Sequence, residues 1–253
     1  MVAVLVLALG PACGQGDPGA ASVKVAASTS TSSTTTSSST STSTSTSTTS
    51  TSTTTTTRPP TVVTLPPQVR VVTDLGTTPM VLTDGITLVH PSRRVERVAF
   101  HESNHDGARH LEATGTAVRP TVLETRDRGT GGQTAADVVV DPDLEVLAPV
   151  TGTVKRAGTY TLYCRWSDEY VVIVPDGADW DHWDVKILHI VGVQVRAGDH
   201  VVAGETVIAA RPHVLDFESQ VDELRTADPA WPHVHIEAVD PTVPDRPSPG
   251  PGC

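Results

Sequence analysis

The chain is short of basic residues and of long apolar runs, and each shortage excludes a class of protein. Its 18 Lys and Arg residues stand against 29 Asp and Glu residues, which gives a net charge of -11. A chain of this charge is repelled by phosphate backbones, so no nucleic-acid partner is expected. The longest apolar run, residues 1–9, is far shorter than the roughly 20 residues that a membrane helix needs. Composition therefore excludes a basic DNA-binding protein and a protein with many membrane spans.

Only 38% of the residues are apolar, and one segment accounts for this low share. Residues 28–57 are an unbroken run of Ser and Thr. Outside that run the apolar content is close to that of an ordinary folding chain. Because the run has no apolar side chain to bury, we predict a disordered, Ser/Thr-rich tether over residues 13–68. Such a tether would hold a folded part away from its point of attachment.

The N-terminus has the pattern of an export signal. The apolar residues 1–9 are followed by Gly10-Pro11-Ala12-Cys13. This arrangement resembles a bacterial lipoprotein signal, and the resemblance implies cleavage of residues 1–12 and lipidation of Cys13. The expected location is then the cell envelope outside the cytoplasm, with a lipid anchor in the membrane. The alternative is an ordinary cleaved signal peptide and a secreted protein.

Only three cysteines are present, and two remain if Cys13 carries lipid. A disulfide between Cys164 and Cys253 suits an oxidising compartment. It would tie the Pro/Gly-rich tail, residues 244–253, to the folded part and close a loop of about 90 residues. The chain-entropy treatment credits such a loop with roughly 4–5 kcal/mol. The alternative is a pair of free thiols.

From residue 69 onward the sequence predicts a mainly β structure. Short runs rich in Val, Ile, Thr and Tyr alternate with Gly, Pro and Asp, which is typical of strands and turns. Examples of such runs are residues 69–72, 95–100, 137–140, 145–150, 170–174, 185–190 and 201–209. One short helix is expected over residues 216–226, where Phe217, Val221 and Leu224 share a stripe. We predict a small strand-rich segment at 69–120 and a β domain at 121–243.

Candidate functional residues gather in the second half of the chain. His233, His235 and Glu237 alternate with Val234, Ile236 and Ala238. In a strand, residues two apart point to the same face, so both imidazoles would line one polar face. A metal and a substrate could then be held side by side. A histidine pair on a strand is by itself more often plain polar surface.

Three segments in order make the pattern more specific. They are Ala136-Asp137-Val138 with the later Ala148-Pro149-Val150-Thr151-Gly152-Thr153-Val154, then Leu188-His189-Ile190 with the turns at Gly198 and Gly204, and finally His233-Val234-His235-Ile236-Glu237. Together they resemble the M23, or LytM-like, zinc endopeptidases. The resemblance implies an antiparallel β-sheet domain similar to a barrel-sandwich hybrid, and peptidoglycan peptides as substrate. It assigns Asp137 and His235 as zinc ligands and His189 and His233 as catalytic residues.

One position departs from the family pattern. The first metal ligand of the family lies four residues before the Asp, and here that residue is Gln133. An amide oxygen is a poor zinc ligand, and a catalytic zinc normally has three protein ligands. A substitute histidine would restore the set, and His101, His105, His110 and His213 are the candidates. Two interpretations stay open: a degenerate domain that binds peptidoglycan peptides or regulates a cell-wall hydrolase, and an active zinc endopeptidase that uses a substitute third ligand.

Three further patterns have simpler interpretations. His101-Glu102-Ser103-Asn104-His105 matches the His-Glu-x-x-His zinc motif, which functions only on a helix, whereas this segment follows a predicted strand and meets Asp106-Gly107 at once. The Asp-rich residues 176–184 lack the ligand spacing of an EF-hand and are expected to form a hairpin loop. The β pattern also resembles biotinyl and lipoyl carriers, but neither Lys155 nor Lys186 is flanked as a carrier lysine is.

Overall fold

The computed structural model describes residues 70–247, except for 77, 115–117 and 178–181. The chain divides into two units, residues 1–60 and 61–253, and all described residues belong to the second. The expected signal peptide, Cys13, the tether and Cys253 lie outside the described residues. Within these ranges, no helix is long and apolar enough to cross a membrane.

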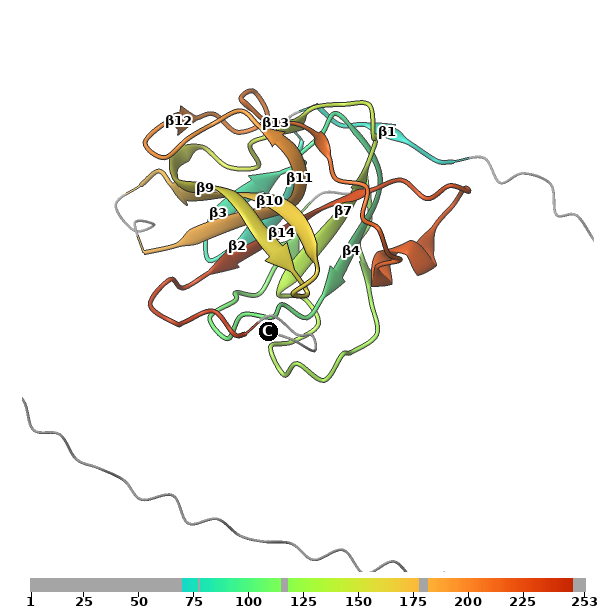
Figure 1. Ribbon diagram of the computed structural model, residues 1–253, viewed down its shortest axis with the longest axis horizontal. Coiled ribbons are helices and arrows are strands. Elements are labelled where there is room, and N and C mark those ends of the chain that lie inside the picture. Colours follow the sequence, from blue (N-terminus) through green and yellow to red (C-terminus); the bar gives the residue numbers. More distant parts are fainter. Residues whose placement is uncertain (1–69, 77, 115–117, 178–181, 248–253) are drawn as a thin grey trace, which may run out of the picture. The chain divides into compact units, whose positions relative to one another are not determined.

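The described part of the chain is mainly β, as the sequence predicts (Figure 1). Its one helix is a short 3-10 helix, η1, at Gln220–Leu224. The strands are β1 Thr73–Asp74, β2 Pro79–Thr83, β3 Ile86–Val89, β4 Arg94–His101, β5 Glu112–Ala113, β6 Thr121–Val122, β7 Ala135–Val140, β8 Val146–Leu147, β9 Gly152–Leu162, β10 Trp166–Pro175, β11 Asp184–Val193, β12 His200–Val201, β13 Val207–Pro212 and β14 His233–Val239.

Most strands join one large sheet in the order β1-β4-β7-β14-β11-β10-β9-β12. Pairing along this path is antiparallel throughout, while β6 runs parallel to β4, and β13 pairs with β11 and β8. A second sheet holds β3, β2 and β5. The expected antiparallel β architecture is therefore present. Strand β7 is buried at every position, which fits its near-continuous apolar sequence.

The predicted boundary at residue 120 is not a boundary of the sheet. Strand β4, from the segment 69–120, pairs along its length with β7, from the domain 121–243. Val95, Val98 and Phe100 of β4 enter the same apolar core as Val138 of β7 and Ile187 of β11. The two stretches therefore form one folded unit around the central strands.

Three local features differ from the sequence prediction. The helix expected over residues 216–226 is reduced to η1, because Phe217 packs against Trp166 and Tyr163 instead of continuing a helical stripe. The β2–β3 hairpin and the long strand β9 were not predicted. The hairpin turns at Asp84 and Gly85, both at positive φ; a two-residue Asp-Gly loop of this kind is a strong hairpin signal in a sequence, and the strand pattern alone did not use it.

Candidate metal centre and cleft

Strand register brings three potential metal ligands to one face of the sheet. Strands β4, β7 and β14 are neighbours, and His235 lies directly opposite Asp137. On the other side Asp137 lies opposite Ala99, so His101, two residues further along β4, is its diagonal neighbour on the same face. One ligand atom from each of His101, Asp137 and His235 lies within 4.8 Å of the others.

The carboxylate of Asp137 is the centre of this cluster. Its Oδ1 atom lies 2.9 Å from Nδ1 of His235 and 3.0 Å from Nε2 of His101. Its Oδ2 atom lies 3.8 Å from Nε2 of His233. Burial alone would raise the pKa of Asp137, but the charges and hydrogen bonds of these imidazoles hold its pKa well below the usual value. The side chain is therefore an anion under neutral conditions.

The ring of His101 presents its Nε2 atom to that anion. Its Nδ1 atom lies 3.0 Å from the backbone carbonyl oxygen of Glu102, an acceptor that requires the proton on Nδ1. The other nitrogen, Nε2, is buried, faces Asp137 and has no hydrogen-bond partner of acceptable geometry. A nitrogen this close to a carboxylate oxygen needs a positive charge between the two atoms, which either a proton on Nε2 or a metal ion supplies. This geometry fits a bound metal ion.

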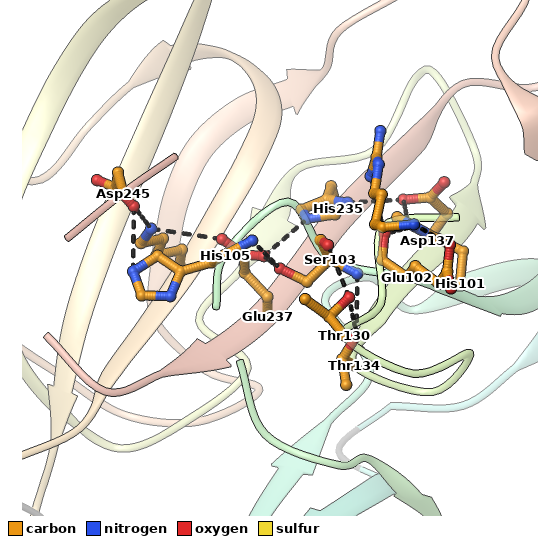
Figure 2. A network of polar contacts seen from close by, with 12 residues as sticks. His101, Glu102, Ser103, His105, Thr130, Thr134, Asp137, His235, Glu237 and Asp245 are labelled. Atoms are coloured by element: carbon orange, nitrogen blue, oxygen red, sulfur yellow. Dashed lines mark hydrogen bonds and ion pairs between the residues drawn. The ribbon is translucent and has the colours of Figure 1, made fainter. Parts of the chain in front are cut away.

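An outer carboxylate supports His235 (Figure 2). Nε2 of His235 lies 3.7 Å from Oε2 of Glu237, which also accepts a hydrogen bond from the Ser103 hydroxyl. Burial lowers the pKa of His235, but its hydrogen bonds to Asp137 and Glu237 outweigh burial and raise the pKa to about 9. A carboxylate behind a ligating histidine is the usual arrangement in metal sites, where it fixes the tautomer of the ring.

His189 and His233 lie beside the cluster. The ring centroid of His189 is 5.0 Å from that of His233 and 5.8 Å from that of His235. His233 is two residues from His235 on β14 and therefore shares its face. Burial lowers the pKa of His233 to about 3, so its ring is neutral at physiological pH.

A β-bulge brings His189 to the same face. Across β10 and β11, Tyr170 pairs with Leu188 and Glu169 pairs with Ile190, so His189 is the extra residue. Its φ of 62° is uncommon for a residue other than glycine. Bulges of this kind change the direction of a side chain beside a functional site. Both Leu188 and His189 consequently line the cleft.

The four residues chosen from the sequence converge on one cavity of about 780 Å³. Asp137, His189, His233 and His235 all line it, and so does His101. Among the four histidines left open as a third ligand, His101 is the one in the cluster. His105 lies 3.3 Å from Asp245, His213 contacts Asp168, and His110 is exposed.

Gln133 is not part of the cluster. Its side-chain amide donates a hydrogen bond to the Leu111 carbonyl, and the residue does not line the cavity. The expected position of the first family ligand is therefore not part of the cluster, and His101 of the neighbouring strand β4 lies there instead. The signal in the sequence was that the predicted strand 95–100 ends directly before His101. Asp168, which contacts His189, was not foreseen.

The structure bears on two of the three simpler interpretations, while the predicted loop at 176–184 includes residues 178–181, which lie outside the described residues. Residues 102–105 are not helical, so His101 and His105 do not form a helical His-Glu-x-x-His site. Lys155 and Lys186 lie within β9 and β11 and pair with Asp184 and Asp245, away from any hairpin tip. Cys164 is disulfide-bonded, while its expected partner, Cys253, lies outside the described residues.

Comparisons of the chain with protein-family models, with curated proteins and with solved structures gave no match. The resemblance to the M23 peptidases therefore rests on the sequence motifs of the chain alone.

Proposed function

We propose that the protein is a zinc-dependent peptidase of the M23 type that acts on peptidoglycan peptides outside the cytoplasm. The observation that carries the proposal is the cluster of His101, Asp137 and His235, which supplies three ligands on the wall of a cavity. Two histidines and one carboxylate are a common donor set for catalytic zinc. The Nε2 atom of His101, 3.0 Å from Oδ1 of Asp137, is the atom through which this ring would ligate the ion.

The metal ion and the two histidines beside the cluster would have different roles. A zinc ion held by His101, Asp137 and His235 would supply Lewis acidity toward a carbonyl oxygen and toward water. His233 is neutral, so one of its nitrogens donates a hydrogen bond and the other accepts one. This ring can stabilise the negative oxygen that develops on the scissile carbonyl. His189, placed at the bulge beside it, can take up a proton from the attacking water.

The substrate class rests on the motif resemblance and on the size of the cleft. A cavity of about 780 Å³ has room for several residues of an extended peptide. The aromatic side chains of Tyr160, Tyr163, Tyr170 and Phe217 line it together with the histidines. Export, as the N-terminal pattern predicts, would bring this cleft to the cell wall, with Cys13 as the lipid anchor.

A degenerate binding domain is the competing function, and one experiment separates the two. Purified protein is stripped of metal with a chelator, titrated with zinc, and assayed for release of soluble fragments from purified peptidoglycan. We expect one zinc per chain and hydrolysis that is lost on stripping and regained on adding zinc. Asp137→Asn should abolish both. Peptidoglycan binding with no stoichiometric zinc and no release would contradict the peptidase and support the binding domain.

Gln133→Ala is the matched control for that experiment. If Gln133 were a ligand, as its position in the motif implies, zinc binding would weaken in this variant as it does in Asp137→Asn. Because the Gln133 amide instead bonds to the Leu111 carbonyl, we expect unchanged zinc stoichiometry and hydrolysis. The loss of that one hydrogen bond should cost about 1 kcal/mol of stability.

A further inference from the structure

A buried carboxylate behind His189 accepts hydrogen bonds from three side chains. Asp168, in β10, has a fully buried side chain. Its Oδ2 atom lies 2.6 Å from Nδ1 of His189 and 2.6 Å from the Tyr160 hydroxyl, and its Oδ1 atom lies 2.8 Å from Nδ1 of His213. Burial would raise the pKa of Asp168, but these bonds lower the pKa to about 2. Asp168 is therefore an anion that only accepts hydrogen bonds.

This acceptor determines which nitrogen of His189 carries the proton. A carboxylate has no proton to donate, so the Nδ1 atom of His189 must be the donor at 2.6 Å. In the neutral ring, the lone pair is then on Nε2. The bulge at His189 brings the ring to the cleft, beside His233 and His235. The nitrogen that can accept a proton, Nε2, is thus on the side of the ring away from Asp168.

His213 holds the same residue in two ways. Its backbone N–H donates to the backbone carbonyl of His189 at 2.9 Å, and its ring donates to Asp168. A non-glycine residue at a φ of 62° is strained, and such a conformation persists only where the surroundings hold it in place. Strand β13, which carries His213 just beyond its end, pairs with β11 directly after the bulge. Asp168 and His213 together therefore fix both the backbone and the ring of His189.

We propose that Asp168 and His213 form a positioning pair for His189, which keeps its ring in the Nδ1–H form with Nε2 directed into the cleft. The side-chain hydrogen bonds of Asp168 and His213 in the described part of the chain go to His189, to Tyr160, to the backbone of Glu169 and to each other, so their effect on chemistry passes through His189. The inference rests on the proposed function for the role of His189, but the tautomer itself does not depend on a metal. Tyr160 contributes the third bond to the carboxylate and lines the cleft.

The direct test is long-range proton–nitrogen NMR of the imidazoles in the metal-free, full-length wild-type protein. The signals of His189 are assigned by their loss in His189→Gln, and spectra are recorded at a pH at which this ring is neutral. We expect the Nδ1–H form for His189. A ring in the Nε2–H form overturns the proposal. Since the result comes from the wild-type protein without zinc, neither a misfolded variant nor failure of the proposed function obscures it.

The second test separates positioning from structure. In the zinc-loaded protein, Asp168→Asn should lower kcat for peptidoglycan hydrolysis at least about 100-fold, with KM and zinc affinity nearly unchanged. In other hydrolases an amide in place of the carboxylate that orients a catalytic imidazole costs up to about 10⁴-fold. His213→Gln should give a smaller loss of the same kind. A variant Asp168→Asn that folds and keeps wild-type kcat overturns the proposal.

Asp141→Asn is the control for a loss that comes from stability alone. Asp141 is also a buried aspartate, follows the end of β7 and pairs with Arg94, but it does not line the cleft. Its replacement should destabilise the fold without changing kcat or the tautomer of His189. If Asp141→Asn lowers kcat as far as Asp168→Asn does, the effect is structural and the positioning role is wrong.

Discussion

The Nε2 atom of His101 lies 3.0 Å from Oδ1 of Asp137. The two residues come from stretches that the sequence analysis assigned to different parts of the chain, the segment 69–120 and the domain 121–243. The contact exists because β4 and β7 pair with Ala99 opposite Asp137, which leaves His101 as the diagonal neighbour. A shift of one residue in this register would turn His101 to the opposite face of the sheet. The third ligand of the proposed zinc site is thus a consequence of strand pairing.

Replacing His101 should weaken zinc binding far more than replacing His105. Zinc sites with four protein ligands total about 10–16 kcal/mol, so losing one ligand should cost about 3 kcal/mol, or roughly 100-fold in Kd. We therefore expect His101→Gln to raise the Kd for zinc by about that factor. His105→Gln should leave the Kd within a few-fold of wild type, because His105 faces Asp245 instead of the cluster.

Competition titrations with a zinc-chelating dye measure both constants. The two histidines belong to the same five-residue motif, so they are closely matched in sequence position. Equal loss of affinity in both variants would favour a His-Glu-x-x-His site and contradict the assignment of His101, Asp137 and His235.

The sequence predicts most of this site, and the part that it leaves open has a physical cause. The alternation around His233 and His235 is a local property of one strand, so it can be recognised without a structure. The third ligand depends on how β4 aligns with β7, and no local pattern encodes that register. For the same reason His101 was only one of four candidates.

The hydrogen bond between His189 and Asp168 could not be predicted from the sequence, for a related reason. Asp168 reaches His189 across β10 and β11, where a bulge shifts the pairing by one residue. The bulge depends on a left-handed conformation at a histidine, for which the sequence has no marker such as glycine. The helix expected at 216–226 failed because tertiary packing of Phe217 outweighed a weak helical stripe.

A methyl group added at Gly152 should destabilise the fold strongly. Gly152 begins β9 and pairs with Pro175 and Val201, and a Cβ atom there would meet the Val174 carbonyl oxygen at 2.2 Å. Since that neighbour is backbone, the strands themselves would have to move. We expect Gly152→Ala to lower the free energy of unfolding by about 3 kcal/mol or more, measured by urea denaturation.

Gly158→Ala is the control in the same strand. A Cβ atom there comes no closer than 3.9 Å to Tyr170, which is an ordinary contact. Its unfolding free energy should stay within about 1 kcal/mol of wild type. If the two variants are equally stable, the close approach of β9 and β10 at Gly152 is wrong.

Buried His90 should make the protein less stable in mild acid. Burial lowers the pKa of His90 to about 4, from 6.5 in the unfolded chain. The folded state therefore favours the neutral ring, and its contribution to stability is complete above pH 6.5. That contribution is lost as the pH falls from 6.5 toward 4, and it amounts to about 3 kcal/mol.

Denaturant unfolding at a series of pH values measures this effect. Between pH 6.5 and 4 the unfolding free energy of His90→Leu should fall less steeply than that of wild type. The exposed histidine in His110→Leu serves as control, and its curve should parallel that of wild type. Parallel curves for wild type and His90→Leu would show that His90 does not titrate as its burial requires.

The disulfide at Cys164 should close on the C-terminal tail. Cys164 lies in the hairpin turn between β9 and β10, next to Tyr163 of the cleft wall. If its partner is Cys253, a thiol reagent should leave Cys164 unlabelled in the unreduced wild type and label it in Cys253→Ser. Cys13→Ser should leave Cys164 protected. Mass spectrometry of the labelled peptides identifies which cysteines have reacted. Labelling of Cys164 in Cys13→Ser, and not in Cys253→Ser, would show that Cys164 pairs with Cys13 and would contradict the prediction.

The most direct test of the central claim is the zinc X-ray absorption spectrum of the zinc-loaded protein. We predict one zinc per chain, a first shell of nitrogen and oxygen atoms at about 2.0–2.1 Å, and the outer-shell scattering of two imidazoles. In His101→Gln the spectrum should show one imidazole. Zinc bound through sulfur, or no stoichiometric zinc at all, would contradict a metal centre built from His101, Asp137 and His235.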